Sequence, residues 1–263
     1  MKLSFLRIAS ATTLLCLFAG ARIASASALT ITYYTISSSD PDANHLGGGT
    51  VNNEVGPTLG SHGLPVLNLN QYTGCTTTCF TLTPPGVDAS NSLLSDGEIT
   101  YWSPANNSYV TQTGSAPVTL PFSNDAFFPP NGTNGCGGDG GACGFQAATL
   151  TGTITAPTSE VLNFTVSSDD MAFVYIDGNI VCDDGGIHGE SPEPCTTPTV
   201  SAGDHTFALF FVDLNVSQSA LDFSIQTTGV TTTPSGVPEP STLILLGTGI
   251  VGAAGAIRRR IAR

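Results

Sequence analysis

Short apolar segments rich in β-branched residues recur along residues 29–228 of this 263-residue chain, and Gly, Pro, Asn, Ser and Asp separate them. Segments of this length between turn signals are typical of a β-sandwich or a β-barrel. Apart from the two ends of the chain, no segment shows a long apolar period of 3.6 residues. Roughly 200 residues suffice for one domain with a proper core, so we expect one all-β domain over residues 29–226. The segments expected to be strands are 29–36, 97–103, 109–113, 149–156, 161–168, 171–177, 179–183, 205–213 and 220–228.

Residues 1–28 have the form of a secretory signal peptide. Lys2 and Arg7 give a positive start, an apolar run covers residues 11–19, and small-x-small cleavage sites follow at 24–28. The apolar run is too short to span a bilayer as a permanent anchor. We therefore expect export through the Sec pathway and removal of this segment.

The C-terminal end holds three parts in order: Pro238-Glu239-Pro240, an uncharged segment at 241–257, and four arginines among the last six residues. A plain tail anchor is one interpretation, although 17 helical residues cover only roughly 25 Å of a hydrocarbon core about 30 Å thick. Arginines after such a segment stay on the cytoplasmic side. The composition of residues 227–236 is that of a flexible linker.

In this order, the three parts closely resemble the PEP-CTERM sorting signals of Gram-negative bacteria. The resemblance implies that residues 237–263 are a sorting signal with a transmembrane helix, and that a membrane enzyme, exosortase, recognises and processes it. The protein would then be anchored in the inner membrane before sorting, and would reach the cell surface or the extracellular matrix afterwards.

All seven Lys and Arg residues lie in residues 1–22 and 258–263, whereas all 20 acidic residues lie between Asp40 and Glu239. The exported region therefore has no Lys or Arg. Nucleic-acid binding depends on such cations pairing with phosphates, so this class of function is excluded. An acidic chain of this kind repels itself unless its carboxylates are spread out, hydrogen-bonded or neutralised by metal ions.

Six cysteines remain once Cys16 is removed with the signal peptide. Six cysteines allow 15 connectivities, and export to an oxidising compartment favours disulfides between close neighbours. A metal site is the rival interpretation, but the spacings lack the paired C-x₂-C pattern of zinc ribbons. The expected disulfide pairs are Cys75 with Cys79, Cys136 with Cys143, and Cys182 with Cys195.

Five aspartates fall within the stretch SSDDMAFVYIDGNIVCDDGGIHGE at residues 167–190. Asp177-Gly178 is a strong hairpin turn signal between two short strands. The hairpin would leave Asp177 in the turn and bring the other four to its open end, where they repel each other unless protons or a cation neutralise them. Alternatively, Asp183 and Asp184 belong to a solvated turn. The four are Asp169, Asp170, Asp183 and Asp184.

This stretch and the following segment AGDHTFALFFVDLNVSQSALDFSIQT resemble the fibro-slime domain, a relative of the PA14 β-sandwich. The resemblance is strong over residues 145–228 and weaker back to about residue 44. It departs at Phe173, where the family has Trp, and at the cysteine pair 182/195, which lies outside the family's core motif. The matching segments are Ser168-Asp169-Asp170, 174–178, 185–188, 203–211 and 221–225.

The resemblance implies a PA14-like antiparallel β-sandwich and a calcium site. PA14-type lectins hold calcium, which in turn binds sugar hydroxyls, with two adjacent aspartates joined by a cis peptide bond. Adjacent strand residues normally point to opposite faces, and a cis bond lets their carboxylates converge. By position Asp169 and Asp170 match this pair, with Asp183 and Asp184 as helpers.

Histidines carry less information in this sequence. His188 and His205 fit structural roles in a loop and at a strand start, and His45 and His62 lie in Gly-rich loops.

Three functions fit these observations. The first is an exported, non-enzymatic binding protein of the cell surface or matrix that contacts extracellular polysaccharide through calcium. The second is a purely structural matrix protein without a ligand. The third is a glycoside hydrolase, which ranks last: the sequence has no G-x-S-x-G or H-E-x-x-H motif, and only an unassigned carboxylate pair would serve.

Overall fold

The structure is a computed structural model that describes residues 29–40, 49–68, 92–124, 144–214 and 219–234. These residues form 12 strands joined by turns and loops. The expected signal peptide, sorting signal and C-terminal helix lie outside the described residues, and so do Cys75, Cys79, Cys136 and Cys143. In the described part of the chain, no helix is long and apolar enough to cross a membrane.

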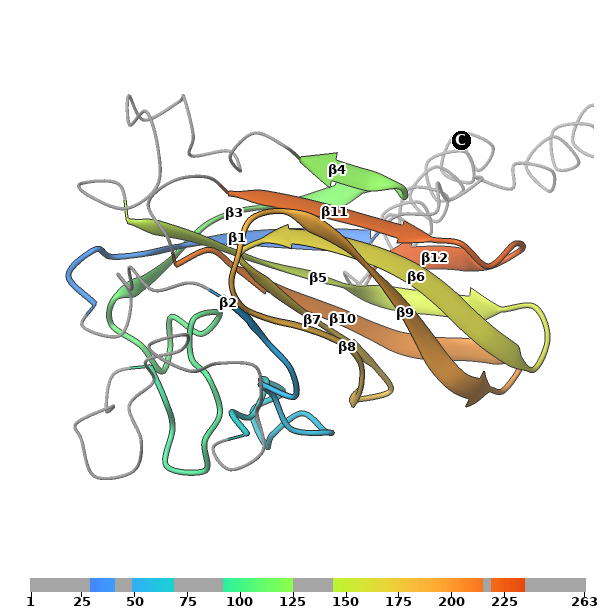
Figure 1. Cartoon of the computed structure of the whole chain (residues 1–263), viewed down its shortest axis with the longest axis horizontal. Coiled ribbons are helices and arrows are strands. Elements are labelled where there is room, and N and C mark those ends of the chain that lie inside the picture. Colours follow the sequence, from blue (N-terminus) through green and yellow to red (C-terminus); the bar gives the residue numbers. More distant parts are fainter. Residues whose placement is uncertain (1–28, 41–48, 69–91, 125–143, 215–218, 235–263) are drawn as a thin grey trace, which may run out of the picture.

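The strands form two antiparallel sheets that face each other, which confirms the predicted all-β sandwich (Figure 1). An eight-stranded sheet has the order β2-β8-β7-β10-β5-β1-β3, with β12 also paired to β5, and a four-stranded sheet has the order β4-β11-β6-β9. The strands are β1 (Leu29–Ile36), β2 (Gly49–Val51), β3 (Val110–Val118), β4 (Phe122–Asn124), β5 (Phe145–Ala156), β6 (Glu160–Asp169), β7 (Met171–Ile176), β8 (Asn179–Ile187), β9 (Ser191–Val200), β10 (Gly203–Val212), β11 (Ala220–Ile225) and β12 (Thr231–Pro234).

The eight-stranded sheet is buried on both faces at β7 and β10. Because strand residues alternate between faces, Val174 and Phe211 enter the core between the sheets, together with Phe164 and Phe223. Phe173, on the opposite face, belongs to a second apolar cluster. Burial of one such large side chain contributes roughly 1.5–3 kcal/mol.

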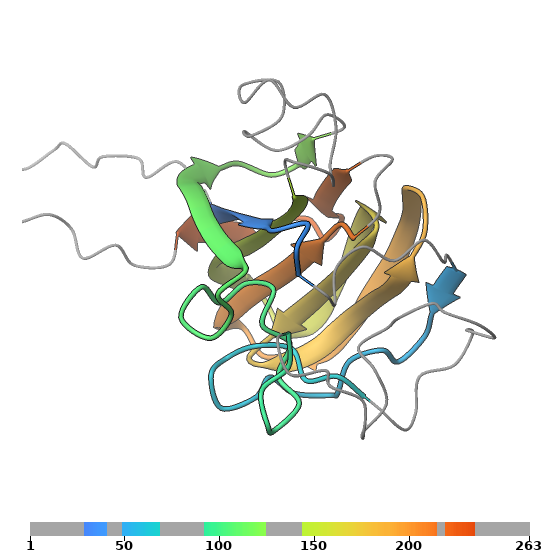
Figure 2. The same cartoon turned by 90° about the vertical axis from the view of Figure 1, so that its left-hand side faces the viewer.

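Two long loops cover the outer face of this sheet. Residues 52–68 and 92–109 gather on the lower side of the strands in both views (Figures 1 and 2). They bring Leu64, Tyr101 and Trp102 into the second cluster. The Trp102 indole packs edge-on against Phe210 with 5.2 Å between ring centroids, and its Nε1 donates a hydrogen bond to the Phe211 carbonyl oxygen at 2.6 Å. These contacts fix the 92–109 loop against β10.

Residues 97–103 differ from the expectation, because they do not form a strand. They make only isolated bridges, Val66 with Glu98 and Leu93 with Ile99. Their apolar, β-branched character serves burial in the second cluster, where Ile99 and Tyr101 are almost fully inaccessible. A loop whose side chains are buried can therefore have the same apolar, β-branched composition as a strand.

Four strands form where the sequence predicted none, namely β2, β4, β9 and β12. β9 carries three prolines, a residue that does not donate to a sheet ladder, and it is tolerated because β9 is an edge strand paired only to β6. β12 lies in the segment predicted as a linker. It pairs with Gly152–Thr155 of β5, just beyond the residues of β5 that pair with β1, and so covers an edge that β1 leaves open.

Candidate functional site

The Asp169–Asp170 step is where the chain passes from one sheet to the other. Asp169 ends β6 and pairs with Ala220 in the four-stranded sheet, whereas Met171 begins β7 and pairs with Val212 of β10 in the eight-stranded sheet. The peptide bond between the two aspartates is cis, as the resemblance implies. The step therefore lies between the two sheets of the sandwich.

A third aspartate joins this pair. Asp213 directly follows Val212, and the pairing of Val212 with Met171 sets it beside Asp170. One carboxylate oxygen from each of Asp169, Asp170 and Asp213 lies within 4.8 Å of the other two, and all three side chains are buried. Sequence reasoning missed Asp213. In the sequence, Asp213 is visible only as an acidic residue at the end of the FFVD segment. Its position beside Asp170 follows only once β10 is known to neighbour β7.

The three carboxylates occupy an environment that disfavours negative charge. Asp170 is 1% exposed, and burial, aided by the charge of Asp169, raises its pKa to about 7 against the opposing effect of the Leu214 amide. Asp170 Oδ2 accepts a hydrogen bond from Leu214 N at 2.8 Å, whereas its buried Oδ1 accepts none from the described residues. A proton or a cation at this position would relieve the repulsion.

Asp183 and Asp184 lie near the open end of the hairpin but do not join this group of three. The Asp183 carboxylate accepts a hydrogen bond from Val55 N at 3.1 Å, and burial together with the charge of Asp184 raises its pKa to about 7. The reason for the separation is register: Asp183 and Asp184 pair with Phe173 and Ala172 inside the β7–β8 ladder, whereas Asp170 and Asp213 lie beyond it.

Asp184 has its own partners. Ser168 Oγ donates to Asp184 Oδ2 at 2.7 Å, and His188 Nε2 lies 3.2 Å from Asp184 Oδ1. Burial alone would lower the pKa of His188, but the hydrogen bond and the charge of Asp184 outweigh it and raise the pKa to about 9. His188 is thus protonated at neutral pH and supplies positive charge to a region that has no Lys or Arg.

Glu54 is a further buried acid that the sequence did not reveal. Its side chain is fully inaccessible and rests against Gly185, where a Cβ would collide with the carboxylate. Burial and the charge of Asp183 raise the pKa of Glu54 well above its usual value. Gly185 therefore makes room for this side chain, and the acidic region extends from the hairpin into the loop after β2.

The turn end of the hairpin is different. Asp177 has a φ of 50° next to Gly178, which confirms the predicted turn. Its carboxylate also accepts hydrogen bonds from His205 Nδ1 at 2.6 Å and from Thr206 N at 2.8 Å. Asp177 thus fixes the turn to β10, in addition to shaping the turn itself.

One expected disulfide lies within the described residues. Cys182 on β8 is bonded to Cys195 on β9, with 5.5 Å between their Cα atoms. Since β8 and β9 belong to different sheets, this bond links the two layers of the sandwich.

Comparisons with solved structures return partial likenesses. The PA14 domain of the antifreeze protein MpAFP is 16% identical, with a TM-score of 0.31, and the match covers 36% of this chain and 56% of that one. A PA14 sugar-binding domain from an RTX adhesin is 12% identical, with a TM-score of 0.35, over 80% of this chain and 96% of that one. An alpha-xylosidase of family GH31 from Xanthomonas citri is 13% identical, with a TM-score of 0.32, and the match covers 47% of this chain and 14% of that one.

The chain spans 56%, 35% and 34% of the first three similar structures. A search of curated proteins finds no relative of this sequence. Residues 236–260 match the family model of the PEP-CTERM protein-sorting motif, which confirms the prediction from Pro238-Glu239-Pro240 and the segments after it. The C-terminus of this chain therefore carries a PEP-CTERM protein-sorting motif.

Proposed function

We propose that this protein is an exported, non-enzymatic module that binds extracellular polysaccharide through a calcium ion, and that exosortase sorts it to the cell surface or matrix. The observation that carries the calcium proposal is the convergence of Asp169, Asp170 and Asp213, whose oxygens approach within 4.8 Å of one another in a buried setting. The PEP-CTERM match at residues 236–260 supports sorting by exosortase.

The donor set fits calcium. All three side chains offer carboxylate oxygens, the ligands that hard cations prefer, and Ca²⁺ accepts six to eight oxygens in flexible geometry. Asp170 Oδ1, which is buried and accepts no hydrogen bond from the described residues, provides a ready ligand atom. Asp169, Asp170 and Asp213 would hold the ion, which when bound supplies positive charge and open coordination positions for sugar hydroxyl groups.

Thermal unfolding of the full-length protein in detergent, with Ca²⁺ and then with a chelator, tests the metal site. Saturation at about 100 times Kd contributes about 2.7 kcal/mol, which for a domain of this size raises Tm by roughly 5–10 °C. Asp169→Asn with Asp170→Asn should abolish this rise. Asp204→Asn, which removes an exposed carboxylate at the start of β10, is the matched control and should keep it.

A glycan array probed with and without Ca²⁺ tests the ligand class. Binding that requires both Ca²⁺ and the two aspartates supports the proposal. A calcium-dependent rise in Tm without any glycan binding would favour the structural matrix protein instead. An unchanged Tm would refute the metal site.

Deletion of residues 237–263 tests the sorting proposal separately. The truncated protein should leave the envelope fraction and appear in the periplasm or medium. Unchanged retention in the envelope would contradict sorting through the PEP-CTERM motif.

A further inference from the structure

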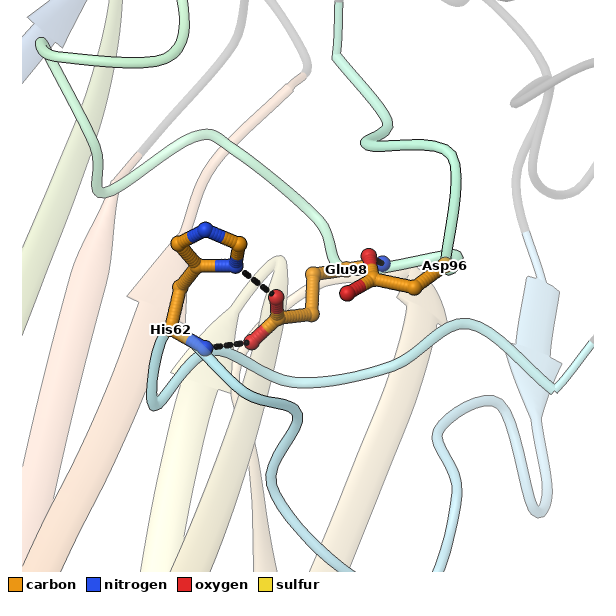
Figure 3. Close-up of side chains that lie close together, drawn as sticks. All are labelled: His62, Asp96 and Glu98. Carbon is orange, nitrogen blue, oxygen red and sulfur yellow. Dashed lines mark hydrogen bonds and ion pairs between the residues drawn. The ribbon is translucent and has the colours of Figure 1, made fainter.

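A second cluster of metal-ligating side chains lies in the loops outside the strands. Residues 60–67 and 94–99 run side by side: Val66 forms a bridge with Glu98, Leu67 N donates to the Gly97 carbonyl oxygen at 2.9 Å, and Ile99 N donates to the Pro65 carbonyl oxygen at 2.8 Å. This pairing places His62, Asp96 and Glu98 together (Figure 3). One ligand atom from each lies within 4.8 Å of the other two.

Glu98 is the fixed member of the cluster. Its side chain is fully buried, and its Oε1 accepts hydrogen bonds from His62 N at 2.8 Å and from Leu64 N at 3.2 Å. Gly60 leaves the space that the carboxylate occupies, since a Cβ there would collide with it. The backbone therefore holds the carboxylate in place, with Oε2 directed at the His62 ring (Figure 3).

His62 and Asp96 form the accessible side. His62 Nδ1 lies 2.5 Å from Glu98 Oε2, and the His62 side chain is 51% exposed. Asp96 is exposed, and its Oδ2 accepts a hydrogen bond from Ser61 Oγ at 3.3 Å. Asp96 Oδ1 also accepts a hydrogen bond from Glu98 N at 3.3 Å, which holds this carboxylate beside Glu98. An ion can reach the cluster from solvent, and water can complete its coordination.

The donor set differs from that of the aspartates between the sheets. It combines one imidazole nitrogen with two carboxylate oxygens, a set that suits zinc and similar divalent transition metals rather than calcium. No Lys or Arg exists between residues 23 and 257. Neither Glu98 nor Asp96 therefore has a Lys or Arg side chain to balance its charge.

We propose that His62, Asp96 and Glu98 form a binding site for a divalent transition metal ion of the zinc class. The ion takes the place of the hydrogen bond between His62 Nδ1 and Glu98 Oε2, and the neutral imidazole ring then carries its proton on Nε2. At metal–ligand distances of about 2.0–2.2 Å, tetrahedral ligand atoms lie about 3.3–3.6 Å apart, so these two atoms need to separate by about 1 Å. Half-exposed His62 can make this movement, while Glu98 stays on its backbone donors.

Titration of the full-length protein, purified without a polyhistidine tag and stripped with a chelator, tests this site. Zn²⁺ binding is followed by calorimetry, and Co²⁺ binding by its visible absorption. His62→Ala should remove one equivalent of bound metal, and Asp96→Asn should weaken that equivalent by about tenfold or more.

Controls separate this site from other metal ligands in the chain. His205→Asn removes a histidine that contacts one carboxylate, Asp177, and should leave the metal count unchanged. Asp170→Asn should also retain the His62-dependent equivalent, because Asp170 belongs to the other group of carboxylates. Circular dichroism confirms that each variant is folded.

Equal metal counts for the wild-type protein and His62→Ala would overturn the proposal. So would a His62-dependent equivalent that excess Ca²⁺ displaces as well as Zn²⁺ does, because the site would then lack the selectivity that its nitrogen ligand implies. In either case the His62–Glu98 pair would be a clamp between the two loops. Failure of this test leaves the calcium proposal untouched, because the two groups share no residue.

Discussion

The two ends of the β7–β8 hairpin carry aspartates in opposite environments. At the turn end, the side chain of Asp177 is 49% exposed and pairs with His205. At the open end, Asp170 and Asp183 are largely buried, and burial raises the pKa of each to about 7. The same residue type therefore stabilises one end of the hairpin as an anion and strains the other end unless it is neutralised.

The difference lies in the available partners. Asp177 has donors from the neighbouring strand, namely His205 Nδ1, Thr206 N and Thr206 Oγ1. At the open end, His188 is the cationic side chain that the described residues place beside Asp184, and several further carboxylates surround it. The comparison teaches that hydrogen-bond donors and burial, rather than the count of aspartates, decide whether the pKa of an aspartate in this hairpin is lowered or raised.

The largest expected effect is at Asp183 in metal-free protein. A carboxyl whose folded pKa is raised contributes stability below its unfolded pKa of about 3.9, and this stability is lost as pH rises to about 7. Asp183→Asn, which keeps an acceptor for Val55 N, should flatten this decline by up to about 4 kcal/mol. Urea unfolding at pH 4.5 and pH 7.5 with a chelator measures it.

Asp204→Asn is the control for this measurement, because it removes an exposed carboxylate. It should show the pH dependence of the wild-type protein. Equal slopes for Asp183→Asn and the wild-type protein would contradict the description of the open end as strained.

Next in size is the disulfide between the two sheets. A sequence separation of 13 between Cys182 and Cys195 corresponds to about 3 kcal/mol of loop-closure stabilisation. Cys182→Ala with Cys195→Ala should lower Tm by roughly 6–12 °C. The pH dependence of stability that arises at each end of the hairpin should persist in this variant. Its disappearance would show that the difference between the two ends depends on the disulfide.

A smaller effect is expected at His188. The raised pKa of about 9 means that its contribution is complete below about pH 6.5 and is lost as pH rises through about 9. His188→Gln should cost about 2 kcal/mol at pH 6.5 and much less at pH 10. Chemical unfolding across this range checks it, and a cost that is independent of pH would point to lost packing instead.

The smallest effect is expected at the turn. Burial raises the pKa of Asp177, but hydrogen bonds from His205 and Thr206 outweigh it and lower the pKa, while the hydrogen bond to Asp177 raises the pKa of His205. The pair therefore stabilises the protein fully between about pH 4 and 6.5, and less on either side. Asp177→Asn should cost under about 1 kcal/mol, since this pair is screened by solvent.

Thermal scans at pH 5 and pH 9 measure this last effect. The difference between the variant and the wild-type protein should be larger at pH 5, because His205 is protonated there. A larger loss of stability at pH 9 than at pH 5 would contradict the description of Asp177 and His205 as an ion pair.

Local patterns predicted much of this fold, because strands and turns depend on nearby residues. The Asp177-Gly178 turn and the strands on both sides of it follow from alternation and turn chemistry. β9 did not follow, since its prolines are acceptable only at an edge, and edges are a property of the whole sheet.

The candidate sites were less accessible from sequence for the same reason. Asp169 and Asp170 are adjacent in the chain, so the resemblance identified them, whereas Asp213 reaches them only through the pairing of β10 with β7. Glu98 and His62 belong to two loops whose contact depends on an isolated bridge. Contacts between residues this far apart in sequence have no local signal.

The prolines of β9 affect how readily one molecule of this protein pairs with another through its sheet edge. Exposed sheet edges invite strands from other molecules, and natural proteins often block them with lysine or proline. Residues 29–234 contain no lysine. Pro192 and Pro194 are two residues apart, so their missing N–H groups fall on the same side, and β6 occupies the opposite side of the strand. β9 thus resists edge-to-edge aggregation without any positive charge.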